Sequence, residues 1–361
     1  MRRVEAYVVD LGLVGLPQSG KSSLLALLSG GTGRGDVAVA KVPDPRLDAL
    51  ASIFHPKKVT PATIRLTELP GLIPGRLGEG ERNSFFEGVR RTDALLQVVR
   101  AFDDPSVPHP AGSVDPLRDA RGVEEEMLLA DLEQVEALVA RLEKNRGRGR
   151  SEDLQLDVLR RCAAALGDLR PLRLAGLTAD DARLLGGFGL LTARGELAAL
   201  NLAEEDLRGS AGGIARTHPL AEWAHEQGIE LVPFSARVEA EIAALPLAER
   251  AEFMGAYGLA APGTDRPAAA AYAALGLVSF LTAGEDEVRA WPVPAGTPAR
   301  RAAAKIHSDI ERGFIRAEVV RFADLQAAGS WKALREKGLV RLEGKDYPVQ
   351  DGDIIEFRFH V

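Results

Sequence analysis

The sequence predicts an α/β fold in which helices cover both faces of a parallel sheet, with an inserted antiparallel helical arm and a smaller C-terminal module. Three observations predict it. Short apolar segments alternate with helical ones through the N-terminal part. A heptad pattern interrupts this alternation. Beyond an alanine-rich stretch over residues 260–274, strand-like segments return at residues 287–293 and 314–320.

The predicted sheet begins with residues 8–14, a short apolar run that ends at Gly15 and is typical of a buried parallel strand. A helix with a leucine-rich side follows, and Gly30 and Gly31 end it. The leucines of that side are Leu24, Leu25, Leu27 and Leu28. Further strands are predicted over residues 64–69, 94–99, 197–200 and 229–234.

The arm is predicted from apolar residues that recur at alternating spacings of four and three. They are Leu128, Leu132, Val135, Val139 and Leu142. A second helix carrying Leu159, Cys162, Leu166 and Leu169 is expected to return along this seam. Residues 144–150 connect the two helices and place four basic side chains between glycines. Two interpretations of this tip stay open, a solvated hairpin end and an RNA contact.

The composition is that of an ordinary globular protein, since 46% of the 361 residues are hydrophobic and 27% are charged. This length predicts more than one domain. The net charge of −7 argues against a surface that coats nucleic acid, so we expect no DNA partner and only a confined RNA site. Cys162 is the single cysteine, which excludes an intramolecular disulfide and a cysteine zinc cluster. No apolar run reaches the roughly 18 to 20 residues that cross a bilayer, so we expect a cytoplasmic protein without a membrane partner.

A phosphate-binding motif follows the first predicted strand: Gly15-Leu16-Pro17-Gln18-Ser19-Gly20-Lys21-Ser22 matches G-x-x-x-x-G-K-[ST]. In such a P-loop, backbone N–H groups and a helix N-terminus face the phosphate oxygens. Lys21 is expected to neutralise the β- and γ-phosphates, and Ser22 to offer its hydroxyl to Mg²⁺. With the adjacent Ser23, these residues form the predicted phosphate site, whose ligands are ATP or GTP and Mg²⁺.

Further segments, in the same order along the chain, resemble the YchF family of Obg-related P-loop proteins. In the N-terminal part they are Pro43-Asp44-Pro45-Arg46-Leu47-Asp48, Val99-Arg100-Ala101-Phe102-Asp103-Asp104, Leu129-Ala130-Asp131-Leu132-Glu133 and Asn201-Leu202-Ala203-Glu204. In the C-terminal part they are residues 305–309, 313–319, 342–347 and 350–353. The resemblance spans nearly the whole chain, which makes it more specific than any single motif.

This resemblance implies a P-loop G domain, an inserted coiled-coil arm and a C-terminal β-grasp TGS domain. We expect the G domain over residues 1–110 and 192–279, the arm over residues 111–191 and the TGS domain over residues 280–361.

Base recognition is expected at Asn201, Leu202 and Glu204, which stand where other GTPases have Asn-Lys-x-Asp. In that motif the Asp accepts hydrogen bonds from guanine and the Lys stem covers the base. Glu is one methylene longer and Leu is uncharged, so the guanine clamp is altered; the resemblance implies a preference for ATP over GTP. Asn201 and Glu204 also suit the start of a helix as capping residues. Ser235 and Ala236 follow the last strand and are expected beside the base.

Hydrolysis is expected to be slow. Glu68-Leu69-Pro70-Gly71 occupies the position of the D-x-x-G switch, in which Gly71 is expected to contact the γ-phosphate and Glu68 to hold Mg²⁺ through a water. Leu72 stands where Ras-like proteins have a glutamine that orients the attacking water. The family shares such a hydrophobic replacement.

The first switch segment is about ten residues shorter than the family pattern leads us to expect. It holds glycines instead of an aromatic residue. Thr63 is weighed both as a switch hydroxyl for the metal and as an ordinary β-branched strand residue. His109 is weighed as a catalytic or phosphate-facing group and as a solvated loop histidine. Residues 78–83 resemble a flexible second switch.

Three functions remain in view at this level. The leading hypothesis is a nucleotide-dependent switch with slow ATPase or GTPase activity, whose arm and TGS domain contact the ribosome or structured RNA. The second is a catalytically inactive nucleotide-binding scaffold, favoured by Glu68 and the short switch. The third is a phosphotransferase that acts on a small metabolite. The base motif and the C-terminal module argue against it, because such an enzyme needs neither. An RNA-facing patch and a solvated surface both suit the C-terminal basic residues Arg312, Arg316, Lys337, Arg341 and Lys345.

Overall fold

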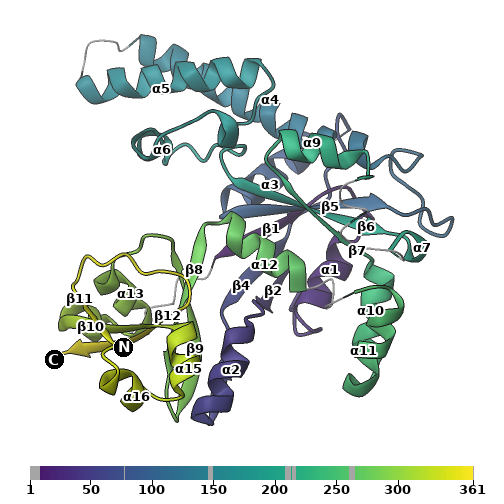
Figure 1. The fold of residues 1–361 in the computed structure, drawn as a ribbon. Coiled ribbons are helices and arrows are strands. Elements are labelled where there is room, and N and C mark those ends of the chain that lie inside the picture. The colour runs from purple at the N-terminus through teal and green to yellow at the C-terminus, as the bar shows by residue number, and fades with distance from the viewer. Residues whose placement is uncertain are drawn as a thin grey trace. The chain divides into compact units, whose positions relative to one another are not determined.

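The computed structural model describes residues 9–76, 78–144, 149–207, 213, 217–259 and 265–360. They form two compact units (Figure 1). The larger unit comprises residues 10–38 and 66–271, and the smaller unit comprises residue 9 with residues 39–65 and 272–360.

The first sheet has the strand order β2-β4-β1-β5-β6-β7, and of its strands β1, β5, β6 and β7 lie wholly within the larger unit. Its strands are β2 (Val37–Lys41), β4 (Thr63–Glu68), β1 (Asp10–Val14), β5 (Ala94–Ala101), β6 (Gly195–Leu202) and β7 (Glu230–Phe234). The pairs β1–β5, β5–β6 and β6–β7 are parallel. Nearly every residue of β5 and β6 is buried, which is why these strands are continuous apolar runs without alternation.

Helices pack on this sheet through two apolar clusters. Phe85, Phe86 and Val89 of α3 (Glu79–Arg90) pack with Val14 of β1. On β5 and β6, the packing residues come from α9 (Leu220–Glu226), α10 (Ala236–Ala244) and the end of α11 (Leu247–Ala256). The remaining helices of this unit include α1 (Lys21–Leu28), α7 (Glu204–Leu207) and the first part of α12 (Asp265–Ala274).

The helical arm consists of α4 (Pro116–Glu143) and α5 (Arg150–Gly167), which lie side by side in Figure 1. The predicted seam is present, because Leu128, Val135 and Leu142 pack in one buried cluster with residues of α5. The prediction for Leu169 is wrong: it follows the end of α5, has a φ of 55° and is 63% exposed. Of the predicted basic tip, residues 145–148 lie outside the described part of the chain. The short helices η1 (Leu172–Leu174) and α6 (Ala179–Leu185) complete the base of the arm.

Asp131 ties the arm to the segment that returns to the sheet. Its carboxylate accepts hydrogen bonds from the backbone N–H groups of Leu191 (2.7 Å) and Thr192 (2.8 Å) and from the Thr192 hydroxyl (2.7 Å). Burial raises the pKa of Asp131, and these donors oppose that shift. Asp131, within the recognised segment 129–133, therefore has a structural role at this joint.

The smaller unit is built on a second sheet of order β11-β10-β12-β8-β9-β3. Its strands are β11 (Arg341–Glu343), β10 (Phe314–Arg321), β12 (Asp353–Phe359), β8 (Leu277–Ala283), β9 (Glu287–Pro294) and β3 (Lys58–Thr60). The accompanying helices are α2 (Pro45–Phe54), α13 (Ala299–Ile306), α14 (Ser308–Arg312), α15 (Phe322–Ala328) and α16 (Trp331–Glu336).

Residues 39–65 belong to the smaller unit, although the sequence led us to expect them within the G domain. β3 pairs in parallel with β9, with Val59 opposite Val288. α2 packs against β9 and against α15. An N-terminal segment therefore completes the C-terminal sheet, a pairing that local sequence patterns do not encode. Among the described residues, no helix combines the length and the hydropathy needed to cross a membrane.

Candidate nucleotide-binding site

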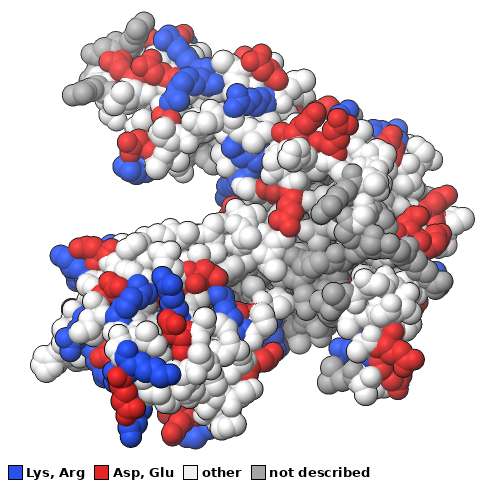
Figure 2. Space-filling model, in the orientation of Figure 1, with Lys and Arg blue, Asp and Glu red and all other residues white. Residues whose placement is uncertain are grey.

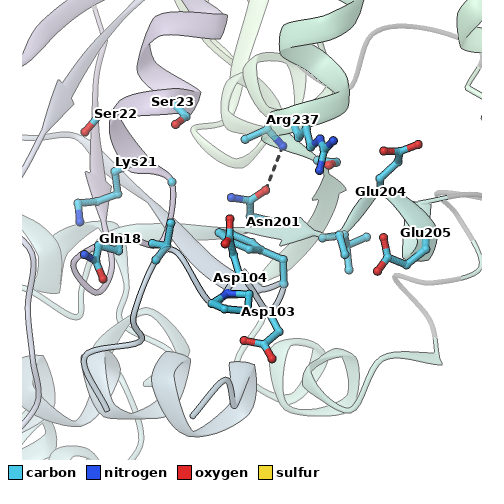
Figure 3. Close-up of a pocket in the computed structure, with 18 of the residues that line it drawn as sticks. Gln18, Lys21, Ser22, Ser23, Asp103, Asp104, Asn201, Glu204, Glu205 and Arg237 are labelled. Atoms are coloured by element: carbon cyan, nitrogen blue, oxygen red, sulfur yellow. Dashed lines mark hydrogen bonds between the residues drawn. The ribbon is translucent and has the colours of Figure 1, made fainter. Parts of the chain in front are cut away.

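A cavity of about 660 Å³ lies in the larger unit, where the loops after β1, β5, β6 and β7 meet (Figure 3). The carboxyl ends of parallel strands are where α/β sheets bind their ligands, and this volume suits a nucleotide. Twelve of its nineteen lining residues are polar or charged. The lining residues are Gln18, Gly20, Lys21, Ser22, Ser23, Glu68, Phe102, Asp103, Asp104, Pro105, Val107, Asn201, Leu202, Ala203, Glu204, Glu205, Ser235, Ala236 and Arg237.

The P-loop adopts a conformation that requires glycine at two positions. Gly15 has a φ of 136° and Gly20 a φ of 105°. A Cβ atom on Gly15 would lie 2.4 Å from the Val98 carbonyl oxygen, and one on Gly20 would lie 2.4 Å from Asn201 Nδ2. Any larger side chain would therefore push the loop away from β5 or from the end of β6.

Lys21 is the first residue of α1 and is held inside the curve of the loop. Its Nζ donates hydrogen bonds to the carbonyl oxygens of Gly15 (3.1 Å) and Leu16 (2.9 Å). Burial lowers the pKa of Lys21, while the Glu68 carboxylate acts in the opposite direction. A phosphate gives this ammonium charged acceptors, which bind it more strongly than neutral carbonyl groups do.

Ser22 and Glu68 form the oxygen-rich end of the pocket. The Ser22 hydroxyl donates to Glu68 Oε1 at 2.7 Å. The backbone N–H of Glu68 donates to the Asp36 carbonyl at 2.7 Å, so the short switch segment is attached beside this pair. A hydroxyl next to a carboxylate is a donor set that suits Mg²⁺, whose other ligands are phosphate and water oxygens. Among the described residues, no group of three or more His, Cys, Asp or Glu side chains is arranged to hold a metal ion by itself.

The base end of the pocket is organised by Asn201. Its Nδ2 donates to the Ser19 carbonyl (3.0 Å), and its Oδ1 accepts from the Ala236 backbone N–H (3.0 Å; Figure 3). Asn201 thus ties the P-loop to the loop after β7. Glu204 accepts a hydrogen bond from the Tyr257 hydroxyl at 2.8 Å, which orients its carboxylate at the pocket wall.

Sequence comparison connects this geometry to known proteins. A family model described as "50S ribosome-binding GTPase" matches residues 10–137. The C-terminal domain model of YchF GTPases, described as a protein of unknown function, matches residues 277–360. The ribosome-binding ATPase YchF of Bacillus subtilis is 37% identical over 362 residues, which cover 97% of this chain and 99% of that protein. The chain belongs to the YchF family.

Other YchF relatives agree over the same length. Obg-like ATPase 1 of Oryza sativa subsp. japonica is 36% identical and covers 98% of this chain and 92% of its own. The structure of the Schizosaccharomyces pombe YchF GTPase superposes with a TM-score of 0.86 at 28% identity, over 97% of both chains. The family and the P-loop G-domain fold with a C-terminal domain, both predicted from the sequence, are confirmed.

The pocket contains a wall that sequence reasoning did not assign. Phe102, Asp103, Asp104, Pro105 and Val107 come from the loop after β5. Residues 99–104 belong to the segments that resemble the YchF pattern, but the sequence pattern alone assigns them no role. Their position after a predicted strand was the available signal, because such loops meet at one edge of a parallel sheet. Ala203, Glu205 and Arg237 were also missed, although each adjoins a predicted residue.

The structure brings eleven of the predicted residues together around the pocket: Gln18, Gly20, Lys21, Ser22, Ser23, Glu68, Asn201, Leu202, Glu204, Ser235 and Ala236. The other P-loop residues, Gly15, Leu16, Pro17 and Ser19, do not line the pocket. Gly71 does not line it either, and a Cβ atom there would lie 2.8 Å from the Pro17 ring. The main chain at Gly71 therefore passes directly beside the P-loop.

His109 is not a pocket residue in this structure, which corrects its assignment as a catalytic candidate. Its side chain is 5% exposed, and its Nε2 lies 2.9 Å from Asp119 Oδ2. The Ala111 backbone N–H donates to its Nδ1. The alternative interpretation, a solvated loop histidine, is also wrong, because the ring is buried in a local hydrogen-bond network.

Thr63 cannot bind the same metal ion as Glu68. The two residues stand at opposite ends of β4, and five steps along a strand span about 16 Å. They also project from opposite faces, because side chains alternate along a strand. Thr63 is therefore a β-branched strand residue, the other interpretation of this position.

Two switch expectations change as well. Residues 79–83, expected as part of a flexible second switch, form the first turns of α3, where the Glu81 side chain accepts from the Gly78 backbone N–H. The first switch is short but folded: Arg34 and Val37 pair across a tight turn in which Gly35 has a φ of 60°.

Proposed function

We propose that this chain is a nucleotide-dependent switch that binds ATP in preference to GTP, together with Mg²⁺, hydrolyses it slowly and associates with the ribosome. The observation that carries the proposal is the pocket itself, in which the P-loop lysine, the Ser22–Glu68 pair and the base-side loops line one cavity. Relatives that match 97% of this chain are named ribosome-binding ATPases.

At the phosphate end, Ser22 and Glu68 are the residues that would hold the metal. Bound Mg²⁺ neutralises charge on the phosphates and helps to fix their position. Lys21 supplies a buried positive charge, and the N-terminus of α1 adds its dipole. Glu68 reaches Ser22 directly, so the longer carboxylate does not prevent the two groups from facing one ligand.

At the base end, the preference for ATP rests on three features. Leu202 offers an apolar surface instead of a lysine stem, and Glu204 replaces the aspartate that reads guanine. Tyr257 holds Glu204 by a hydrogen bond to Oε1, so one carboxylate oxygen is already shared. The ATPase names of the bacterial and plant relatives support the same preference.

Slow hydrolysis follows from Leu72. This residue is fully buried in the core with Phe85 and Val89, and its backbone N–H donates to the Gly15 carbonyl. It presents no amide to orient an attacking water. The alternative function, an inactive binding scaffold, differs from the proposal only in that the bound nucleotide is not hydrolysed.

For the ribosome contact, we propose the arm (residues 111–191) and the C-terminal module (residues 280–361). Basic and acidic side chains are interspersed over the face shown in Figure 2. In the basic set singled out from the sequence, Arg312 pairs with Asp309, and Arg341 pairs with Glu343 and Asp353. These pairs weaken the case for an RNA-facing patch and favour a contact through shape and mixed charge. A ribosome partner implies a cytoplasmic location.

The first test is titration of the purified chain with fluorescent ATP and GTP analogues, with and without Mg²⁺, followed by single-turnover phosphate release. We expect tighter binding of ATP, a requirement for Mg²⁺ and slow release of phosphate. Binding without any release would replace the switch by the scaffold. Equal or tighter binding of GTP would refute the base preference.

The partner is tested by co-sedimentation of the full chain with purified ribosomes in the presence of a non-hydrolysable ATP analogue, ADP or no nucleotide. Pelleting that depends on the nucleotide supports the switch. The Lys21→Ala variant is the control. We expect it to pellet to the same extent under all three conditions, whereas pelleting of the unmodified chain should depend on the nucleotide. Absence of pelleting with every nucleotide would reject the ribosome as partner.

A further inference from the structure

A second, much smaller cavity lies in the larger unit between the P-loop and β5. Its volume is about 10 Å³, and Gly15, Leu16 and Ser19 form its P-loop side. Residues 97–100 of β5 and Asp119 of α4 complete its wall. The nucleotide pocket has none of these residues in its lining. The cavity is therefore a separate site behind the phosphate-binding loop.

Four buried polar atoms of this wall find no hydrogen-bond partner of the ordinary kind among the described residues: Ser19 Oγ, Gln97 Oε1, Arg100 Nη1 and Asp119 Oδ2. The four residues are between 1% and 5% exposed. Asp119 Oδ2 has one neighbour, His109 Nε2, at 2.9 Å. Because buried polar atoms are costly to leave unpaired, several of them around one space indicate a bound polar molecule.

We propose that this cavity binds one ordered water molecule. Ser19 Oγ–H and Arg100 Nη1–H are donors, whereas Gln97 Oε1 and Asp119 Oδ2 are acceptors. Water offers two lone pairs and two O–H groups, which match two donors and two acceptors. The volume is also close to the minimum, on the order of 10 to 15 Å³, that a buried water needs.

The charges around the cavity exclude the alternatives of similar size. A cation would meet the Arg100 guanidinium, and an anion would meet the Asp119 carboxylate. The tautomer of His109 follows from its contacts: Nδ1 accepts from the Ala111 N–H, so Nε2 carries the proton and faces Asp119 Oδ2. The amide of Gln97 is oriented by its Nε2, which donates to the Ala120 carbonyl at 3.1 Å.

This water joins the phosphate loop to the wall of the nucleotide pocket and to the start of the arm. Arg100 holds the wall loop by donating to the carbonyl oxygens of Phe102 (3.1 Å) and Val107 (2.8 Å), and it lies over the Phe102 ring. Asp119 belongs to the first turn of α4, which is an arm helix. A four-coordinate water between Ser19, Arg100 and Asp119 thus connects the P-loop to β5 and α4, which the hydrogen bond from Gln97 to Ala120 already joins to each other.

The primary test is a crystal structure of the full chain at a resolution that defines ordered waters. We expect a solvent peak within hydrogen-bond distance of at least three of the four atoms, and no peak in a Gln97→Met variant, whose side chain fills the space without an acceptor. Side chains that turn to bond one another in the unmodified protein, with no peak between them, would overturn the proposal. This test does not depend on the proposed nucleotide-binding function.

A solution test uses Ser19→Ala, which removes one partner of the water without changing any side chain of the nucleotide pocket. We expect ATP affinity to fall about three- to tenfold, as for the loss of one hydrogen bond that supports the loop. The matched control is Ser29→Ala, a buried serine at the other end of α1 whose hydroxyl donates to the Ala26 carbonyl. Equal ATP affinities of the two variants would contradict the role of the water in supporting the P-loop. If neither variant bound ATP at all, the result would contradict the proposed nucleotide site instead.

Discussion

Arg46 and Asp351 form an ion pair with a 2.7 Å distance between Nη1 and Oδ2, although they lie 305 positions apart in the sequence. Arg46 also binds the carboxylate of Asp44, its neighbour at the start of α2. Gly352, beside Asp351, has a φ of 79°, a left-handed conformation that favours glycine. Two segments of the recognised family pattern, residues 43–48 and 350–353, therefore meet inside the smaller unit.

Replacing Arg46 should destabilise this unit. Arg46→Met leaves the largely buried Asp44 carboxylate without its cation, and we expect the free energy of unfolding to fall by about 1–2 kcal/mol. Urea denaturation followed by tryptophan fluorescence measures it, because Trp291 and Trp331 lie in the smaller unit. Lys57→Met, which breaks the exposed pair with Asp286, is the control and should change little. If both variants lower the free energy of unfolding equally, Arg46 contributes no more to stability than an exposed ion pair does.

Lys21→Ala should remove most of the affinity for nucleotide. The loss of a charged hydrogen-bond donor to phosphate corresponds to a decrease of about 10- to 100-fold or more. Fluorescent ATP titration measures it. The control is Lys41→Ala, an exposed lysine at the end of β2. Unchanged affinity of the Lys21 variant would mean that the P-loop is not the phosphate site.

Glu68→Ala should reduce the dependence on Mg²⁺ more than the binding of nucleotide itself. We expect affinity without Mg²⁺ to stay close to that of the unmodified chain, while the gain on adding Mg²⁺ becomes smaller. Titrations with ATP over a range of Mg²⁺ concentrations separate the two effects. Glu87→Ala, on the exposed side of α3, should behave as the unmodified chain. A full Mg²⁺ response in the Glu68 variant would exclude this carboxylate from the metal site.

Tyr257→Phe should weaken the discrimination between ATP and GTP. The hydroxyl of Tyr257 orients Glu204, so its removal lets the carboxylate move at the base end of the pocket. We expect the ratio of the two affinities to change about three- to tenfold. Tyr272→Phe, which removes a buried tyrosine hydroxyl in the smaller unit, is the matched control. If the ratio of ATP to GTP affinity is unchanged in both variants, Tyr257 contributes only to packing and not to base discrimination.

Stability should decline at acidic pH through Glu318. Hydrogen bonds from Arg358 (2.8 Å) and Arg335 (3.0 Å) lower the pKa of its carboxyl to about 2. The folded-state pKa lies below the unfolded value of about 4.3, so this stabilisation is present above that value and is lost as the pH falls towards 2. Both arginines are partly exposed, so we expect a contribution of about 1–2 kcal/mol.

The measurement is the free energy of unfolding as a function of pH for the unmodified chain, Glu318→Gln and the exposed Glu336→Gln. The Glu318 variant should be less stable near neutral pH and show a flatter profile across the acidic range. If the Glu336 variant flattens the profile equally, the acid sensitivity does not come from Glu318.

The sequence by itself determined the P-loop, the parallel strands that precede its binding loops and the seam of the arm. These features depend on local chemistry: Gly15 and Gly20 permit the loop, and apolar residues at heptad spacing lie along one face of their helix. The family followed from the order of several such segments. Most predicted pocket residues follow the ends of predicted strands, and this is why they converge.

Only the tertiary structure decided which strands complete which sheet and which polar groups share a partner. Nothing near Val59 in the sequence indicates that β3 pairs with β9, because strand pairing is a contact between distant segments. The burial of His109 against Asp119 and the grouping of Ser19, Gln97, Arg100 and Asp119 around one small cavity are of the same kind. The chemistry of each residue can be read from its type, but its role depends on neighbours that only folding brings together.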